Sequence, residues 1–585
     1  MQLLDTLRAV WILFVFASVF FIFPEYLSER GNDSPMALRV VGNFARTLLV
    51  VTLAGLLLTS LKILNTTTVV LLLVGALAIA WLRKRAKTSG HWLAALQDFA
   101  IGIVRLFERQ PTSGSSRGPV SPREPKSTSW WAALQGREIL VAAFAVVAIT
   151  TGVLYFARPL QELRLDRPEQ YQVLLRCREL MLNLHAHDRP LIFPSIIATT
   201  SIVNSMDPMQ VTRFISPVFE LFVVLAAGLL IYVTTRGKVA AIVTIYCFGT
   251  AAFQVAGNEA VVPVSTAEKL ESVLRMSLAR NTGSLEFGIG VLCLLLALAF
   301  LADWQQNSRG WDSLIDAGCC LLLVGIVSQV LLLVCLMAAG AVLLRPALGL
   351  IILVLMAYGL AAYAVLTGNL QIPIEGQLTL PLAAVLAVGC FLGFIETKLI
   401  APMGNTAEQL LLLGCVAVAI LWFRPQPLAG RYLEYDKAAS ETQLIAGHFP
   451  RQRWAVVAPT EQLAETLGLG GYEDLAEFVE KYQDQASDPE FHIPDAPEDL
   501  FVYVEKRPFQ FFSREPELVP IGVLADSTYR SYRSPAGRAS LESAALRLCE
   551  GYRKTHSDAD VFFEDEALLI YHVRRQIVVK STTGG

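Results

Sequence analysis

Long blocks of apolar residues, almost free of charge, recur along the first 423 residues of the chain. Phe287–Leu301 and Leu348–Leu366 are two of them, and each approaches the roughly 20 residues that a helix needs to cross a bilayer. Hydrophobic residues make up 54% of the 585 residues and charged residues only 17%, whereas about a quarter of a typical soluble domain is charged. A soluble fold cannot bury so much apolar surface. The sequence therefore predicts an integral membrane protein.

The apolar blocks predict a polytopic α-helical membrane protein with about eleven transmembrane helices. The first block, Val10–Phe23, has no small-residue cleavage site, so we expect it to remain as a helix rather than to be removed as a signal peptide. The predicted spans lie near residues 7–24, 41–61, 66–82, 139–157, 213–235, 239–255, 286–302, 314–337, 346–367, 378–397 and 406–423.

A polar insert, residues 83–138, separates an N-terminal three-helix segment (1–82) from the rest of the membrane region (139–423). The insert holds an amphipathic stretch, Trp92–Phe107, and a linker rich in Ser, Gly and Pro, Thr112–Ser129. It carries ten Lys and Arg against four Asp and Glu. Because basic segments stay on the cytoplasmic side, the insert is expected to be cytoplasmic.

This orientation predicts the side of every later loop. The span 139–157 runs outward, so the loops 157–213 and 255–285 are expected on the extracytoplasmic side. Counting eleven spans then predicts an outside N-terminus and a cytoplasmic C-terminal domain. One span more or fewer would reverse the side of the C-terminal domain.

Residues 424–585 have a different composition and predict a soluble α/β domain. The strand-like runs Trp454–Val457, Leu500–Val504 and Leu568–Val573 alternate with helix patterns. Val561–Phe563 and Leu568–Val573 predict a terminal hairpin, since a short polar turn separates them. The domain has 18 basic and 26 acidic residues, which favours a solvated domain over one bound to an anionic lipid surface. The net charge of the whole chain, −3, indicates no nucleic-acid partner.

The cysteines and histidines do not predict a metal site. His185 and His187 would share one face of a strand, but no third ligand is defined, so we interpret them as part of a polar loop. No CxxC motif occurs, and most cysteines are expected to behave as small apolar residues inside helices. The cysteines inside apolar blocks are Cys247, Cys293, Cys319, Cys320, Cys335, Cys390 and Cys415.

Asp166 in the first outer loop is the main candidate for chemistry. A carboxylate that follows an outward-running helix lies at the boundary between membrane and water, where it can act as a general base on an acceptor. Asp166-x-x-Glu169 also fits a capping box that opens a helix, with Pro168 in the first turn and Tyr171 at helical spacing. The residues alone leave both interpretations open.

The layout of the first outer loop resembles the N-terminal core of polytopic GT-C-type glycosyltransferases, which include oligosaccharyltransferase catalytic subunits and related lipid-linked sugar transferases. An outward helix is followed by the Asp166 loop, an amphipathic helix, Arg189–Pro194, a hydrophobic segment, Ser205–Arg213 and a returning helix. The resemblance covers residues 139–423 and is one of layout more than of sequence motifs. No DxD occurs in the second outer loop and no WWD-like motif in the C-terminal domain, which speaks against an oligosaccharyltransferase proper.

The resemblance implies the site residues and the substrates. Asp166 matches the catalytic acidic residue of the family, and Glu169 lies beside it as a second candidate catalytic carboxylate. The donor would be a polyprenyl-phosphate sugar, and the resemblance is compatible with a divalent metal ion as cofactor. Arg275 and Arg280 in the second outer loop could bind the lipid phosphate. The alternative for both arginines is an amphipathic helix, Thr266–Leu278, with its charges in solvent.

Two carboxylates lie within apolar blocks, and the soluble domain offers one apolar cluster. Asp316 and Glu220 fall near predicted helix ends, where water is expected to reach them, so neither is assigned a role. Phe509, Phe511 and Phe512 are the candidates for a face that packs on the membrane domain.

Two functions from different classes follow. The first is a GT-C-like glycosyltransferase of the plasma (inner) membrane, which moves a sugar from a polyprenyl-phosphate carrier to an acceptor at the extracytoplasmic face. Its partners would be membrane lipid and the lipid-linked sugar. The second is a non-enzymatic membrane scaffold or assembly protein whose soluble domain binds a protein partner. A transporter is disfavoured, because the helices have few polar breaks and no paired ion-binding carboxylates.

Overall fold

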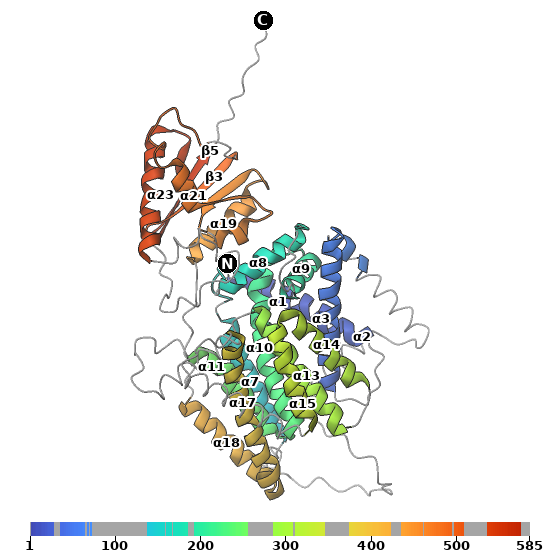
Figure 1. Cartoon of the computed structure of the whole chain (residues 1–585). Coiled ribbons are helices and arrows are strands. Elements are labelled where there is room, and N and C mark those ends of the chain that lie inside the picture. The colour runs from blue at the N-terminus through green and yellow to red at the C-terminus, as the bar shows by residue number, and fades with distance from the viewer. Residues whose placement is uncertain are drawn as a thin grey trace, which may run out of the picture.

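In the computed structural model the chain forms a bundle of helices with a smaller domain, built on a β-sheet, at one end of the bundle (Figure 1). The predicted span 346–367, most of the span 66–82 and nearly all of the insert 83–138 lie outside the described residues. The structure describes residues 2–27, 36–64, 67–69, 71–72, 137–157, 159–165, 168–184, 192–254, 285–307, 311–344, 374–422, 434–459, 461–493, 497–507 and 535–574.

Among these residues, five helices are long and apolar enough to cross a membrane. Three are single elements: α3 (Met36–Ser60), α10 (Pro208–Thr235) and α13 (Leu285–Asn307). The helix Thr6–Glu25 lies within α1 (Gln2–Ala17), the π-helical turn η1 (Ser18–Ile22) and α2 (Phe23–Leu27). Val385–Met403 runs from α17 (Ile374–Ile395) through η2 (Glu396–Ile400) and η3 (Ala401–Met403). Further helices of the bundle are α7 (Arg137–Phe156), α9 (Ile192–Asn204), α11 (Lys238–Gln254) and α18 (Asn405–Trp422).

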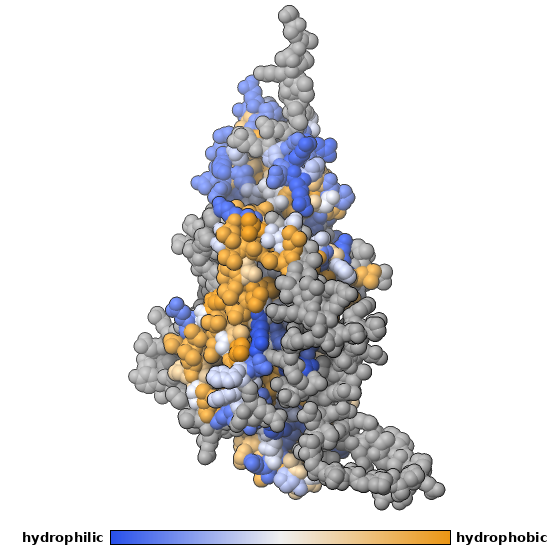
Figure 2. All heavy atoms as spheres, turned by 90° about the vertical axis from the view of Figure 1, so that its right-hand side faces the viewer, coloured by the Kyte–Doolittle hydropathy of each residue, from blue (hydrophilic) through white to orange (hydrophobic). Residues whose placement is uncertain are grey.

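The surface of the bundle fits a membrane environment. Hydrophobic side chains gather on the bundle and hydrophilic ones on the smaller domain (Figure 2). On α3, for example, Val50, Leu53 and Leu57 are all more than half exposed. Exposed apolar side chains at this helical spacing would be unfavourable in water and are favourable against lipid. The long helices and this surface indicate a membrane protein, as the sequence predicts.

The single span predicted at 314–337 is wrong, because two helices occupy this region. α14 (Trp311–Val327) and α15 (Gln329–Leu344) are separated at Ser328, whose hydroxyl accepts a hydrogen bond from the Leu331 amide. Apolar content does not reveal this break. The stretch from 311 to 344 is too long for one bilayer crossing of roughly 20 residues and long enough for two short helices.

Both helices of this hairpin lie along α13. Ser313, at the start of α14, contacts Asp303, and the Leu343 carbonyl, at the end of α15, accepts a hydrogen bond of 2.6 Å from Gln305. The connection between α14 and α15 lies beside Gly290, near the opposite end of α13. α14 and α15 therefore run antiparallel to each other, in place of the single predicted crossing.

One core joins the first helices of the chain to the later ones. α1, α3, α9, α10, α13 and α14 all contribute to it, and every residue from Phe287 to Asp303 of α13 is buried. An ion pair of 2.6 Å between Arg46 of α3 and Asp316 of α14 adds to this contact. Asp316 is 2% exposed, so the expectation that water reaches this carboxylate is wrong: it is neutralised by an arginine instead. Glu220 is also buried.

The smaller domain is built on a five-stranded mixed sheet of order β2-β1-β3-β5-β4. β1 (Trp454–Ala458) pairs in parallel with β2 (Gly471–Asp474) and β3 (Asp499–Glu505). β5 (Leu568–Arg574) runs antiparallel to β3 and to β4 (Ala559–Glu564). The predicted α/β class, three of its strands and the terminal hairpin are confirmed.

Helices cover both faces of this sheet. α19 (Asp436–His448) packs on one face, against side chains such as Phe501 and Ile570. α21 (Leu475–Tyr482) and α23 (Pro535–Thr555) pack on the other face, against side chains such as Val502 and Tyr571. Because both faces are covered, β3 reads as an almost continuous apolar run rather than an alternating one.

The smaller domain lies at the same end of the bundle as the first outer loop (Figure 1). α20 (Glu461–Thr466) of this domain packs on α8 (Pro168–Met181) of the loop. The expectation of a cytoplasmic C-terminal domain opposite an external first loop is therefore wrong.

Candidate functional site

The loop 157–213, which the sequence predicts to be the first outer loop, is covered by the smaller domain, which the sequence predicts to be a soluble domain. Leu165 and Tyr171 are fully buried, and with Leu174 and Leu175 they share one apolar core with the soluble domain. The three residues of α8 follow the spacing of one helix face, as the sequence predicts. The apolar face of α8 is thus directed at the soluble domain.

Asp436, in the first turn of α19, holds the backbone of the loop. One of its carboxylate oxygens accepts hydrogen bonds from the amides of Leu163, at 2.6 Å, and Arg164, at 3.0 Å. The Arg164 guanidinium donates in return to the backbone carbonyl of Glu434, at 2.7 Å. Charge-assisted bonds of this kind are stronger than neutral ones, so this segment of the loop is tied firmly to the domain.

Glu434 lies between the two parts of the molecule and is 1% exposed. Its carboxylate accepts hydrogen bonds from the Tyr171 hydroxyl of α8 and from the Gln462 amide of α20, one on each oxygen. Glu434 therefore joins α8 to α20 across the interface.

Arg178 is the buried cation of this interface and is 6% exposed. Its guanidinium donates to both carboxylate oxygens of Asp207, each at 3.1 Å, and to the Leu467 carbonyl at 3.4 Å. Asp207 also caps α10 by accepting from the Met209 amide at 2.8 Å. One arginine thus joins α8 to the start of α10 and to the end of α20.

Glu465 of α20 is the second buried carboxyl group, with 2% exposure. Burial raises the pKa of Glu465 to about 7, although Glu434, Arg178 and Thr442 offset part of the rise. We call this group of residues the docking cluster: Tyr171, Arg178, Asp207, Glu434, Gln462 and Glu465.

The docking cluster lies where an α/β domain usually takes its ligand. In open sheets of this kind, ligands bind beyond the carboxyl ends of the parallel strands, where the strand order reverses. Gln462 comes four residues after the end of β1, and Tyr435 donates to the Arg507 carbonyl, just beyond β3. Residues 434–436 therefore reach across this edge, and the first outer loop binds against them. In this protein the loop of the membrane domain, rather than a ligand, contacts this edge of the sheet.

Of the predicted site residues, one is placed only by its backbone and three lie outside the described residues. Asp166 is one of the three, although Leu165 beside it is buried under the soluble domain. Glu169 belongs to α8, but its side chain is not described. The described part of α8 begins at Pro168, so the residues at which a capping box would start the helix lie outside the described residues. Arg275 and Arg280 are the other two predicted site residues that lie outside the described residues.

The residues that bring the two parts together could not be found by sequence reasoning. The hydrogen bond from Tyr171 to Glu434 joins residues 263 positions apart, so no local spacing signals it. The described contact face of the domain is α20, with Ala464 buried in the shared core. The face proposed at Phe509–Phe512 lies outside the described residues.

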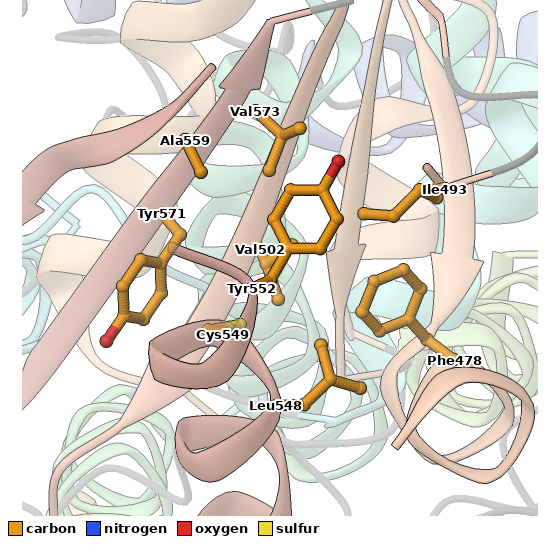
Figure 3. Close-up of a pocket in the computed structure, with 9 residues that line it drawn as sticks. All are labelled: Phe478, Ile493, Val502, Leu548, Cys549, Tyr552, Ala559, Tyr571 and Val573. Atoms are coloured by element: carbon orange, nitrogen blue, oxygen red, sulfur yellow. The ribbon is translucent and has the colours of Figure 1, made fainter. Parts of the chain in front are cut away.

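The sheet and its helices enclose a small cavity. It is lined by eight residues of the sheet, α21 and α23, including Cys549, Tyr552 and Tyr571, and by Ile493 of the loop before β3 (Figure 3). Its volume is about 10 Å³, which admits about one water molecule. This cavity is a packing space of the core rather than a binding site for a sugar or a lipid. In the described part of the chain, no group of three His, Cys, Asp or Glu side chains is arranged to hold a metal ion.

No protein-family model, no curated protein and no solved structure matches this chain. Its function has to be inferred from its own residues and their contacts.

Proposed function

We propose that the protein is a GT-C-like glycosyltransferase of the plasma (inner) membrane, which transfers a sugar from a polyprenyl-phosphate donor to an acceptor at the extracytoplasmic face. The observation that carries this proposal is the seating of the soluble domain on the first outer loop. Leu165 and Tyr171, on either side of Asp166, are fully buried beneath that domain. The residues that flank Asp166 in the sequence therefore lie in the contact between the loop and that domain.

In the proposed reaction Asp166 is the general base, with Glu169 beside it. The acceptor gives its proton to the Asp166 carboxylate and attacks the anomeric carbon of the sugar. The bond between that carbon and the phosphate oxygen breaks, and polyprenyl phosphate leaves with the electron pair. Arg275 or Arg280 would neutralise the phosphate charge that develops. No step of this reaction passes through a metal ion.

The soluble domain has a positioning role in this proposal. Asp436 holds the amides of Leu163 and Arg164, two and three residues before Asp166. Holding a base within a small range of positions contributes to catalysis, because a displacement of about 1 Å can slow a reaction about 100-fold. The domain would thus fix the base without contributing a reacting group of its own.

Substitutions of Asp166 test the proposal. Membranes that contain Asp166→Asn or Asp166→Ala are supplied with radiolabelled polyprenyl-phosphate sugars, and transfer to endogenous acceptors is measured. If Asp166 is the base, both variants lose transfer and remain folded. If it is only a helix cap, Asn is nearly neutral, while Ala lowers stability by about 1 kcal/mol. An Asp166→Asn variant with wild-type transfer would refute the catalytic role. Glu169→Gln, measured in parallel, separates the two carboxylates.

A non-enzymatic scaffold is the second candidate, and the docking cluster favours it. Glu434 and Arg178 are satisfied by partners within the chain, which is the pattern of a structural clasp. In this case the soluble domain would present its outer surface to a protein partner. Wild-type membranes would then show no sugar transfer at all, and Asp166→Asn would leave partner binding unchanged.

A further inference from the structure

Two histidines of the smaller domain lie side by side, away from the docking cluster. His492 belongs to the loop between α21 and β3, and His556 lies between α23 and β4. Their ring centres are 5.2 Å apart, with the ring planes at 72° to each other. Neither residue takes part in a function proposed above. Imidazole nitrogens are common ligands of transition metals, so such a pair can hold a metal ion if each ring has a lone pair available.

The hydrogen bonds of His556 leave its Nε2 as an acceptor. Nδ1 lies 3.1 Å from the Tyr552 carbonyl oxygen and 2.8 Å from the Thr555 hydroxyl. A backbone carbonyl can only accept a hydrogen bond, so Nδ1 carries the proton and Nε2 carries the lone pair. Nε2 is buried without a hydrogen-bond partner, and the whole residue is 6% exposed. Metal-binding histidines show this pattern, with one ring nitrogen bonded to a backbone carbonyl and the other left for the ion.

We propose that His492 and His556 bind a divalent transition-metal ion of the class of Zn²⁺, Cu²⁺ and Ni²⁺. Two imidazoles bound to one tetrahedral ion, with metal–nitrogen bonds of about 2.0 to 2.1 Å, have ring centres about 5 Å apart. The observed separation of 5.2 Å agrees with this spacing. Ca²⁺ and Mg²⁺ are disfavoured, because they prefer oxygen ligands. The inference does not depend on the glycosyltransferase proposal.

The surroundings of the pair favour a cation. Asp558, two residues after His556, has a carboxylate oxygen that is buried without a hydrogen-bond partner, and its negative charge attracts a metal ion. The Tyr552 ring stacks on the His556 ring at 4.0 Å and holds it in one plane. Among the described residues no set of three His, Cys, Asp or Glu ligands is found, so water molecules would complete the coordination.

The pair lies at the edge of the sheet opposite to the docking cluster. β3 and β4 both begin at this edge, since each runs antiparallel to β5, and the two histidines precede them in the chain. His492 is exposed, so an ion can reach the pair from solvent. A bound ion would tie the loop before β3 to the end of α23.

Calorimetric titration with Zn²⁺ tests the proposal on the full-length protein, without a histidine tag, in nanodiscs of phosphatidylcholine after treatment with EDTA. His185 and His187 are replaced by Gln in every sample, because that pair can also hold a metal ion. This parent protein should bind one Zn²⁺ per chain. His492→Ala and His556→Ala should each weaken binding at least about tenfold, since each removes one of the two protein ligands.

His448→Ala is the matched control. The Nδ1 of His448 also lies close to the carbonyl four residues earlier, at 2.9 Å, but within the described residues its ring contacts no other histidine. This variant should bind Zn²⁺ as the parent protein does. The proposal is overturned if the parent protein binds no Zn²⁺, or if His492→Ala binds Zn²⁺ as tightly as the parent. Because His492 is exposed, its replacement keeps the fold and decides the question even if His556→Ala does not fold.

Discussion

Replacing Asp436 by alanine should release the first outer loop from the soluble domain. One oxygen of Asp436 accepts from two backbone amides, those of Leu163 and Arg164, and both bonds are partly buried. A hydrogen bond to a charged group contributes about 1.5 to 3 kcal/mol, and partial burial favours the lower end of that range. Two such bonds give about 3 kcal/mol, which is about a 150-fold change in an equilibrium constant.

Hydrogen exchange at the peptide covering residues 159–165 measures this release directly. Asp436→Ala should raise the opening of Leu163 and Arg164 by about 100-fold. Asp436→Asn keeps one acceptor oxygen without the charge, so about a tenfold rise is expected. Unchanged protection in Asp436→Ala would mean that the loop is not held by the soluble domain.

Asp474 provides a matched control within the same domain. It also accepts from two backbone amides, those of Ala476 and Glu477, but it caps α21 away from the interface. Asp474→Ala should expose those two amides and leave the loop protected. If it exposed the loop as strongly as Asp436→Ala does, general destabilisation rather than a specific contact would explain both results.

Two further predictions concern the membrane bundle. The Glu396 carboxylate accepts hydrogen bonds from three backbone amides at the start of α11, so Glu396→Ala should lower stability by about 3 kcal/mol. The loss is measured as labelling of the buried cysteines at a lower temperature on heating, and Glu408→Ala should have little effect. Equal melting curves for the two variants would refute the stabilising role of Glu396. Asp316→Asn leaves Arg46 only its longer ion pair with Asp312, at 3.3 Å, and should lower stability by about 2 kcal/mol. The double variant Arg46→Met with Asp316→Leu should recover most of this loss, and a double variant no more stable than the single one would contradict this account.

The soluble domain was largely predictable because each of its main strands has a local signal in the sequence. β1, β3 and β5 are apolar runs bounded by polar turns, and the β4–β5 hairpin has a short acidic turn. β2 was missed because Gly471–Asp474 has no apolar run at all. It is an edge strand, and only its pairing with β1 defines it.

The membrane topology was less predictable, because hydropathy measures how apolar a stretch is and not where it turns. The hairpin of α14 and α15 turns at Ser328 within an apolar region, with neither Gly nor Pro at the turn. The docking cluster was beyond reach for a different reason. Tyr171, Arg178 and Glu434 have no pattern in common, and only the tertiary contact between the loop and the domain brings them together.

Labelling from one side of the membrane tests most directly the central claim, that the soluble domain and the first outer loop lie on one side. Leu184, three residues after α8, and Glu566, in the β4–β5 turn, are both exposed and are replaced singly by cysteine in a background without the native thiols. A membrane-impermeant maleimide should label both positions in intact cells and should leave a cysteine at Ser115 of the basic insert unlabelled. Labelling of position 184 without position 566, or the reverse, would place the two parts on opposite sides and contradict the account.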